Sequence, residues 1–457
     1  MILLQRQTEK KQKWPVPRIP SHGLAGNYKE LLSGPAQFYS KAAWQSGGIA
    51  RFRIYHRDFY AVARPDLLHE ILVTRQKKYV KGEVYRNVSV VIGNGLVTTE
   101  GKAWANARKI IQPGFHKKAI AHLIETIHTA CEQTFQRWES NPQDYRDFVP
   151  ESQVITQQVV SETLLGTTLA EMQGAQFAKI LKESQQLLTK KNWSLFKTPF
   201  SWPTPLNRKL LTNRHLIDTF FAKQIEKRCA FGIGKKGDLL DLMLLAHAQA
   251  SEPTISLEQI LNEMLTLFAA GYETTSSAIS WTLYYLCQHP TVEAKVRAEI
   301  DSVLGQRQAT WADLENLTFT ECALKEALRL APPLHSVMRT NLEDEELGGY
   351  HIPKGSLLML SIYGAHRSPE HWQDPEDYRP ERFLPTASQP IYQRAFIPFS
   401  NGERRCMGNM FAMVESKLVL ANLIQKFRFS PKPYTEVTAS PSASFSPNQL
   451  QIAFYPR

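Results

Sequence analysis

The chain has 457 residues, of which 43% are hydrophobic and 21% charged, so it can bury a large core. Its net charge of +11 would suit an acidic protein, an anionic membrane or nucleic acid. Nucleic acid is not expected, because the sequence has no zinc-finger spacing, no helix-turn-helix signature and no basic repeat with interleaved aromatic residues. The five cysteines are an odd number without a C-x-x-C pair, which excludes a disulfide framework and indicates a reducing compartment, the cytoplasm.

The N-terminus offers no membrane anchor. The apolar residues 1–4 are followed at once by Arg6, Glu9 and Lys10, so neither a signal peptide nor a bilayer span can form. We expect a soluble protein in which residues 1–14 are a flexible N-terminal segment.

Periodicity predicts strands first and then a long succession of helices. Residues 49–62 alternate in polarity around His56, Arg57 and Asp58, which indicates a strand, a turn and a second strand. Helices are predicted over residues 118–139, 152–165, 169–188 and 207–229. We expect the cysteines in helical patterns to act as small buried hydrophobes; these are Cys131, Cys229, Cys287 and Cys322.

The segment 192–205 is an aromatic loop between two of these helices. It contains three prolines together with Trp193, Phe196, Phe200 and Trp202. Either it packs on its own domain or it covers an apolar pocket.

The longest predicted helix runs from Ser256 to Gln288, just before Pro290. Ser256 and Gln259 have the spacing of a capping box. A helix of this length spans about 48 Å, enough to cross a whole domain.

The C-terminal third mixes helices and strands. A helix over residues 317–330 is stopped by Pro332 and Pro333. Residues 343–360 are strand-like, residues 409–426 are helical, and residues 427–455 indicate short strands and turns.

The segment from Phe399 to Gly408 reads F-x-x-G-x-R-x-C-x-G and surrounds Cys406. A cysteine thiolate is an electron-rich axial ligand for haem iron. Gly402 allows a tight turn, Gly408 allows close approach, and the helix that begins after Gly408 would stabilise the thiolate through its first N–H groups.

With this motif, the chain resembles the cytochrome P450 haem-thiolate monooxygenases, whose landmarks occur in order from about Pro15 to the C-terminus. The run from Ala270 to Thr275 resembles the family's A/G-G-x-D/E-T-T segment. The resemblance implies that Ala270 leaves room for oxygen on the haem face opposite Cys406. It also implies that Glu273 and Thr274 are the catalytic residues that deliver protons.

Other landmarks concern the haem and the scaffold around it. The pair Glu326 and Arg329 resembles the family's E-x-x-R motif, and with Arg382 it should form a buried, structural charged cluster. The resemblance implies that haem b is held by Cys406, Phe399, Gly408 and Ala270, and that its propionates are bound by Trp104, Arg108, Arg339 and Arg404. His366 also matches a landmark, with a packing or hydrogen-bonding role.

The pocket implied by the resemblance is apolar, which predicts a lipophilic substrate. Its expected lining comprises Phe268, Ala269, Leu334, Val337 and Met338. His335 lies among these residues and is expected to be hydrogen-bonded locally.

The resemblance implies a mainly α fold with a smaller β-rich lobe, a single domain over residues 1–457 that encloses one haem, and a monomer. It implies a monooxygenase that uses O2 and hydroxylates a lipophilic substrate. We expect a long-chain fatty acid, since residues 269–288 resemble the fatty-acid-hydroxylating branch most. A terpenoid such as a sesquiterpene, or another secondary metabolite, is the alternative. A haem-thiolate peroxygenase or isomerase and a haem sensor are further alternatives.

The resemblance also implies a separate electron donor, a ferredoxin or flavodoxin with its reductase, because no part of the chain is left for a flavin or iron–sulfur domain. An acidic donor would suit a basic face on the cysteine side of the protein. Candidate residues for this face are Lys109, Lys117, Arg405 and Lys417.

Overall fold

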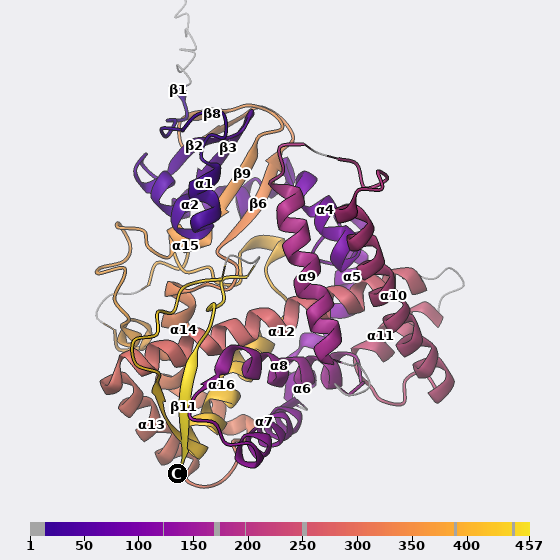
Figure 1. Ribbon diagram of the computed structural model, residues 1–457, viewed down its shortest axis with the longest axis vertical. Helices are drawn as coiled ribbons and strands as arrows, with labels where there is room; N and C mark the ends of the chain where they lie inside the picture. Colours follow the sequence, from indigo (N-terminus) through magenta and orange to yellow (C-terminus); the bar gives the residue numbers. More distant parts are fainter. Residues whose placement is uncertain are drawn as a thin grey trace, which may run out of the picture.

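The computed structural model describes residues 14–121, 123–168, 174–196, 198–248, 254–387, 391–440 and 444–457. Helices account for most of them and form a body around one long central helix, while a smaller lobe holds most of the strands (Figure 1). The expected fold class is therefore confirmed. Of the predicted N-terminal segment, residues 1–13 lie outside the described residues.

The helices are distributed along the whole chain. The α-helices are α1 (Tyr28–Ser33), α2 (Pro35–Trp44), α3 (Pro65–His69), α4 (Gly82–Ile92), α5 (Gly101–Ile111), α6 (Lys117–Ala121), α7 (Leu123–Ser140), α8 (Phe148–Leu164), α9 (Gly174–Asn192), α10 (Pro205–Phe231), α11 (Leu239–Ala248), α12 (Leu257–Gln288), α13 (Pro290–Leu304), α14 (Thr318–Leu330), α15 (Ile362–Ala365) and α16 (Asn409–Lys426). Two short helical turns, η1 (Glu70–Thr74) and η6 (Gly402–Arg404), bear on the site.

The strands form three sheets, ordered β1-β8-β7, β10-β11-β5 and β2-β3-β9-β6-β4. Their bounds are β1 (Trp14–Pro15), β2 (Ile49–Ile54), β3 (Arg57–Val62), β4 (Tyr79–Val80), β5 (Arg146–Asp147), β6 (Ser336–Asn341), β7 (Glu345–Leu347), β8 (Tyr350–Ile352), β9 (Leu357–Ser361), β10 (Phe427–Pro431) and β11 (Gln451–Pro456).

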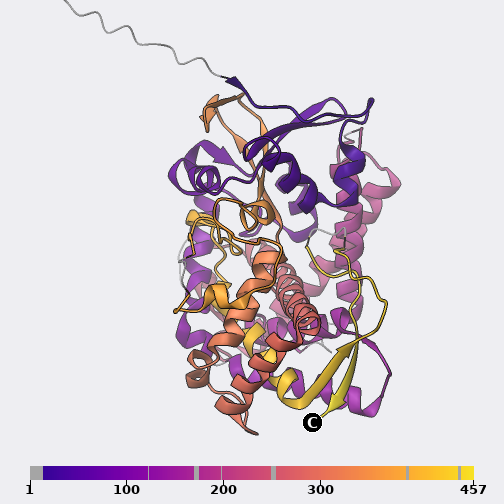
Figure 2. The ribbon, with the colours of Figure 1, turned by 90° about the vertical axis from the view of Figure 1, so that its left-hand side faces the viewer.

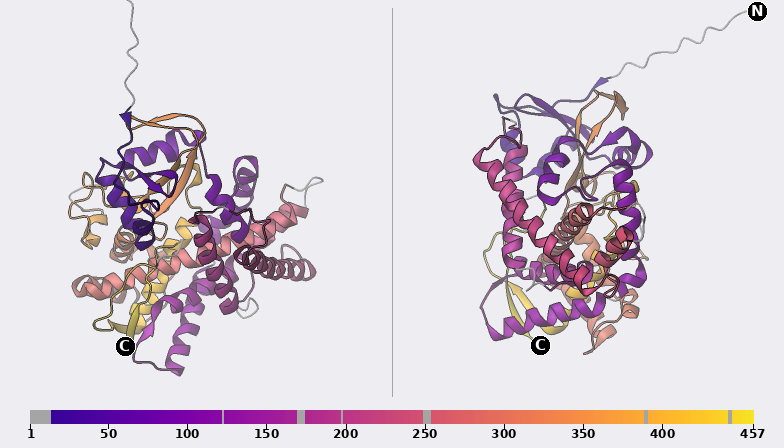
Figure 3. Two further views of the ribbon diagram at one scale, coloured as in Figure 1. Left: turned by 45° about the horizontal axis from the view of Figure 1, so that its top comes forward. Right: turned by 90° about the vertical axis from the view of Figure 1, so that its right-hand side faces the viewer.

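The largest sheet joins the two strand-rich parts of the sequence. The predicted hairpin is β2 and β3, and its turn contains Tyr55 at a φ of 52°. β3 pairs in parallel with β9, with Phe59 opposite Leu357, and β9 pairs antiparallel with β6. This sheet lies at one end of the molecule and the β10–β11 hairpin at the other (Figures 2 and 3).

The central helix α12 begins where the sequence predicts. The Ser256 hydroxyl accepts a hydrogen bond from the Gln259 N–H at 3.1 Å. The capping-box prediction is wrong in its second half, because the Gln259 side chain donates to Asn94 and Glu263 instead. α12 is buried over most of its surface since α8, α10, α14 and α16 all pack on it.

Several predicted boundaries shift. Residues 118–139 form two helices, α6 and α7, and the helix predicted from residue 152 begins at Phe148, where the Asp147 carboxylate accepts from the Val149 N–H at 3.2 Å. α9 starts at Gly174, and residues 169–173 of its predicted range lie outside the described residues. The prolines after α14 end it at Leu330, as expected.

The cysteines are only partly as predicted. Cys131 and Cys322 are buried and Cys287 is half-buried, but Cys229 is exposed on α10. Among the described residues, no helix combines the length and the apolarity that a bilayer span requires.

Candidate haem-thiolate site

Cys406 lies in a constrained turn between η6 and α16. Its N–H donates to the Phe399 carbonyl at 3.0 Å, and Ser400 and Gly402 have φ values of 59° and 73°. A Cβ atom at Gly402 would lie 2.0 Å from the Leu72 carbonyl oxygen in η1. Gly402 is thus required by the turn, as predicted, and also by the close approach of the Leu72 backbone.

Cys406 is exposed as a residue, although its thiol group is largely surrounded by protein atoms. Burial raises the pKa of the Cys406 thiol, whereas the Gly408 N–H, which hydrogen-bonds the sulfur, and the guanidinium of Arg108 act in the opposite direction. Gly408 is the N-cap of α16. The helix N-terminus therefore supplies a donor to the sulfur.

Ala270 is an exposed residue in the middle of α12 and directly follows the buried residues 262–269. At the next position, a Cβ atom on Gly271 would come within 2.9 Å of Val160, so that side of α12 is closed by α8. The Thr274 hydroxyl donates to the Ala270 carbonyl at 2.7 Å. Its oxygen keeps lone pairs that can accept a further hydrogen bond.

Glu273 has partners that the sequence did not reveal. Its carboxylate accepts from the Gln185 side chain of α9 at 2.7 Å and from the Ser444 hydroxyl near the C-terminus. No signal marks Gln185, which is one of several polar residues on its helix. Glu273 is therefore held toward α9 and the C-terminal turn, not directly against Thr274.

Three of the four predicted propionate ligands come together around one indole ring. The Trp104 ring lies 3.9 Å from the Arg404 guanidinium and 5.5 Å from that of Arg108. Arg404 also donates to the Thr99 carbonyl at 2.8 Å, and Arg108 to the Arg405 carbonyl at 3.2 Å.

A lysine that sequence reasoning missed belongs to the same cationic group. Lys81 is buried and donates to the carbonyls of Leu96 and Val97. Burial, followed by the charges of Arg404 and Arg339, lowers its pKa to about 7. Burial likewise lowers the pKa of Arg404 to about 10. Such a cluster calls for an anion of more than one charge.

These residues fit a haem. Within the described parts of the chain, no group of three or more His, Cys, Asp or Glu side chains is placed to bind a metal ion by itself. Cys406 offers a thiolate ligand for haem iron, and the cationic group matches the propionates of the macrocycle.

The predicted charged cluster is present in the structure. Glu326 and Arg329 are both fully buried, and Arg329 donates to the two carboxylate oxygens at 2.7 and 2.8 Å. Arg382 adds a bond to Glu326 at 3.2 Å. Arg329 also donates to three carbonyls, those of His366, Pro375 and Asp377. The cluster thus ties α14 to the segment that leads toward Cys406.

The two histidines behave differently. His366 is fully buried, with one ring nitrogen 3.1 Å from the Arg329 carbonyl and the other accepting from the Ile397 N–H at 3.0 Å. Burial lowers its pKa to about 3, so it is neutral. His335 was expected to be hydrogen-bonded locally, but its Nδ1 is buried without a partner among the described residues.

The predicted pocket residues divide into two groups. Leu334 is 45% exposed and Met338 is half-buried, while Ala269 and Val337 are each 8% exposed. Phe268 is fully buried, and its ring contacts Phe177 and Tyr272. Phe268 is therefore a core residue and not part of a pocket wall.

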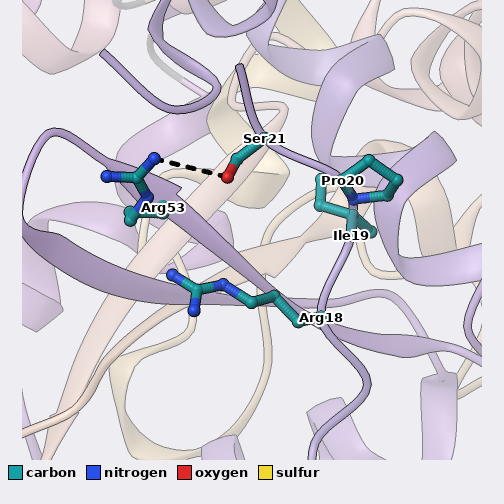
Figure 4. Close-up of a pocket in the computed structure, with 5 residues that line it drawn as sticks. All are labelled: Arg18, Ile19, Pro20, Ser21 and Arg53. Atoms are coloured by element: carbon teal, nitrogen blue, oxygen red, sulfur yellow. Dashed lines mark hydrogen bonds between the residues drawn. The ribbon is translucent and has the colours of Figure 1, made fainter. Parts of the chain in front are cut away.

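A surface depression of about 580 Å³ is lined by none of these residues (Figure 4). Its lining is Arg18, Ile19, Pro20, Ser21 and Arg53, on the N-terminal lobe. The guanidinium of Arg53 is already bonded to the carbonyls of Gly23 and Tyr55. A second one, of about 380 Å³, is lined partly by Lys81 and Glu100 and so borders the cationic group.

Three of the four residues predicted for the basic face are at the surface, and one is not. Lys109, Lys117 and Arg405 are exposed, as expected. Lys417 is buried, and its ammonium group donates to Glu321 and to the Leu314 carbonyl at 2.7 Å. Lys417 therefore cannot contact an electron-donor protein.

In the aromatic loop 192–205, two rings pack on the protein and two are exposed. The Trp193 ring packs 5.8 Å from Phe59 of the β-rich lobe, and Phe200 packs against helix residues of the body. Phe196 and Trp202, by contrast, are 77% and 59% exposed.

Comparisons with known proteins agree with this geometry. The family model described as Cytochrome P450 matches residues 15–453. Cyclooctatin synthase of Streptomyces melanosporofaciens is 30% identical over 438 residues, 95% of this chain and 94% of that protein. Pentalenene oxygenase of Streptomyces avermitilis is 28% identical, with coverage of 95% and 94%.

A solved structure gives the same result at the level of the fold. The crystal structure of the cytochrome P450DA haem domain superposes with a TM-score of 0.87 at 26% identity, covering 97% of this chain and 98% of that one. The sequence landmarks around Cys406, α12 and α14 thus occur in the corresponding fold. The chain belongs to the cytochrome P450 family and is a cytochrome P450 monooxygenase.

Proposed function

We propose that this monooxygenase hydroxylates a terpenoid. Two relatives that match nearly the whole chain, cyclooctatin synthase and pentalenene oxygenase, act on terpenoids. They support the terpenoid alternative better than the long-chain fatty acid that residues 269–288 suggested. The exposed Leu334 and the half-buried Met338 are apolar, which suits such a substrate.

The observation that carries the chemistry is the setting of Cys406, an exposed cysteine whose sulfur accepts a hydrogen bond from the Gly408 N–H at the start of α16. Haem b bound through this thiolate supplies oxygen activation, because the electron-rich ligand favours O–O cleavage. Trp104, Arg108, Arg339 and Arg404, with Lys81, would bind its propionates.

The residues of α12 would manage protons. The Thr274 hydroxyl is oriented by its bond to the Ala270 carbonyl, so its oxygen can accept from a water molecule. Glu273, held by Gln185 and Ser444, would exchange protons with Thr274 through water. Protons would then enter between α9 and the C-terminal turn.

Electrons would come from a separate ferredoxin or flavodoxin with its reductase. Lys109, Lys117 and Arg405 offer an exposed basic surface to an acidic donor.

An optical titration of the purified, haem-loaded protein tests the substrate class. Sesquiterpenes, diterpenes, long-chain fatty acids and aromatic compounds are added separately, and loss of the iron-bound water is followed. We expect the spectral shift with terpenes, and hydroxylated product when a reductase system is added. A shift with fatty acids alone would reject the terpenoid proposal. Turnover with peroxide but none with the reductase system would favour a peroxygenase.

A further inference from the structure

Glu263 is a buried carboxylate on α12 that none of the roles described so far uses. Its side chain is fully inaccessible, and it lies seven residues before Ala270, about 10 Å along the helix. Burial raises its pKa to about 7, against the effect of its hydrogen bonds and of the nearby Lys81. Burying a carboxyl group costs free energy unless hydrogen bonds or a charged partner compensate it.

One carboxylate oxygen of Glu263 contacts the loop 93–99, between α4 and α5, directly, and the other contacts it through Gln259. One oxygen accepts from the Leu96 N–H at 2.9 Å. The other accepts from the Gln259 side chain at 2.7 Å, and the same amide nitrogen donates to the Asn94 carbonyl at 2.9 Å. Glu263 and Gln259 therefore bind the backbone of this loop at two neighbouring points.

The loop is fitted to α12 along its length. A Cβ atom at Gly93 would lie 2.3 Å from the Asn262 side chain, and one at Gly95 would lie 2.2 Å from that of Thr266. Thr266 also donates to the Ile92 carbonyl at 2.9 Å. Only glycines at these two positions let the loop lie so close to the helix.

The other side of the loop is held by the cationic group. Lys81 donates to the carbonyls of Leu96 and Val97, and Arg404 donates to that of Thr99. Leu96 thus has its N–H bound from α12 and its carbonyl bound from the propionate side. These two bonds fix the backbone of Leu96, whose side chain is half-buried.

We propose that Glu263 is a positioning residue that sets the place of the loop 93–99, and with it of Leu96 and Val97. The loop lies against Thr266, about one turn of α12 before Ala269, which is an expected pocket residue. Glu263 acts on how tightly substrate is held and not on the reacting atoms, because its contacts are with the loop and with Gln259. The effect on substrate binding rests on the proposed function. The effect on the position of the loop does not, since it can be measured without substrate.

The variant Glu263→Gln is the sharpest test. Both partners of Glu263 are donors, so a glutamine, with one acceptor and one N–H2 group, keeps the volume but must lose one of the two bonds. Glu258→Gln is the matched control, because Glu258 is exposed in the first turn of the same helix.

The first readout is hydrogen exchange of haem-loaded protein. In Glu263→Gln we expect exchange to become about tenfold faster in residues 93–99 and to stay unchanged in the rest of the protein. The second is substrate binding, where we expect Kd and KM to rise about tenfold with kcat and the carbon monoxide spectrum unchanged. Glu258→Gln should match the parent protein in both.

Unchanged exchange in residues 93–99 would overturn the inference, and so would faster exchange spread over all of α12 or a fall in kcat at constant KM. If Glu263→Gln does not fold, Gln259→Met replaces it, since it removes the donor to both Asn94 and Glu263 at a half-buried position. Failure of every terpene to bind the parent protein would instead count against the proposed substrate class, and the exchange result would still decide the role of Glu263.

Discussion

The protonation state of Lys81 should change when haem binds. Burial and the neighbouring guanidinium groups lower its pKa to about 7, so in the protein alone the amine becomes neutral above that pH. Propionates beside Lys81 would raise this pKa again. Haem binding would then take up a proton above pH 7.

We therefore predict that haem affinity falls as pH rises above about 7, by up to tenfold per pH unit until the haem-bound pKa is reached. Lys81→Met should remove this slope, whereas the exposed Lys182→Met should keep it. The measurement is haem transfer to an acceptor protein between pH 6 and pH 10, a range chosen to bracket both pKa values. An equal slope in Lys81→Met would contradict the assignment.

Glu326 has a structural role that can be tested at the same scale. Its removal would leave Arg329 fully buried without its carboxylate, at a cost of about 3 to 5 kcal/mol. We predict that Glu326→Ala yields little haem-loaded protein. Glu376→Ala is the control, because the Arg367–Glu376 pair has an exposed carboxylate. Normal haem content per purified protein in Glu326→Ala would refute the prediction.

Among the elements, the contact between η6 and η1 fixes the turn that carries Cys406. Gly402 has a positive φ and lies against the Leu72 carbonyl, whereas Gly355 has a similar φ of 79° with nothing nearby to meet a Cβ atom. Comparing alanine variants at these two glycines therefore separates the cost of backbone strain from the cost of a close backbone contact.

We predict that Gly355→Ala costs about 1 to 2 kcal/mol of unfolding free energy, the strain of a left-handed alanine. Gly402→Ala should cost about 2 kcal/mol more, because the added methyl group must displace the backbone of η1. Denaturant unfolding of both variants gives the comparison. Equal losses would mean that η1 moves aside freely.

The ends of the helices could be predicted from the sequence, but their long-range contacts could not. Ser256 and Pro290 mark the ends of α12 by local chemistry, and the prediction was right there. The side chain of Gln259 leaves its expected cap for the loop 93–99, a contact across more than 160 residues that no local pattern encodes. The burial of Phe268 and of Lys417 is likewise decided by which helix packs on which face.

At the scale of the molecule, the fold and the candidate site were inferred mainly from motifs with fixed spacing. The Cys406 segment, the Glu326–Arg329 pair and the mainly α fold with its β-rich lobe could all be inferred before the structure. Lys81 and Gln185 could not, since a lone lysine or glutamine gives no signal. The substrate class needed the comparison with whole relatives, because pocket shape depends on many weakly constrained apolar residues.

The charge distribution of the whole molecule leads to a prediction about reduction. Lys109→Glu with Lys117→Glu should slow electron transfer from an acidic donor and weaken its dependence on salt. Lys29→Glu with Lys41→Glu makes the same change in net charge on α1 and α2 of the N-terminal lobe. Stopped-flow measurement of the haem reduction rate compares the two double variants. Equal rates would exclude docking at the Lys109 and Lys117 surface.

The most direct test of the account is the spectrum of the reduced protein with carbon monoxide. The purified, haem-loaded chain should give the Soret band of a thiolate-ligated haem, and Cys406→Ser should lose this band. A band typical of histidine or water ligation in the parent protein, or a thiolate-type band that survives in Cys406→Ser, would contradict the assignment of Cys406 as the haem ligand.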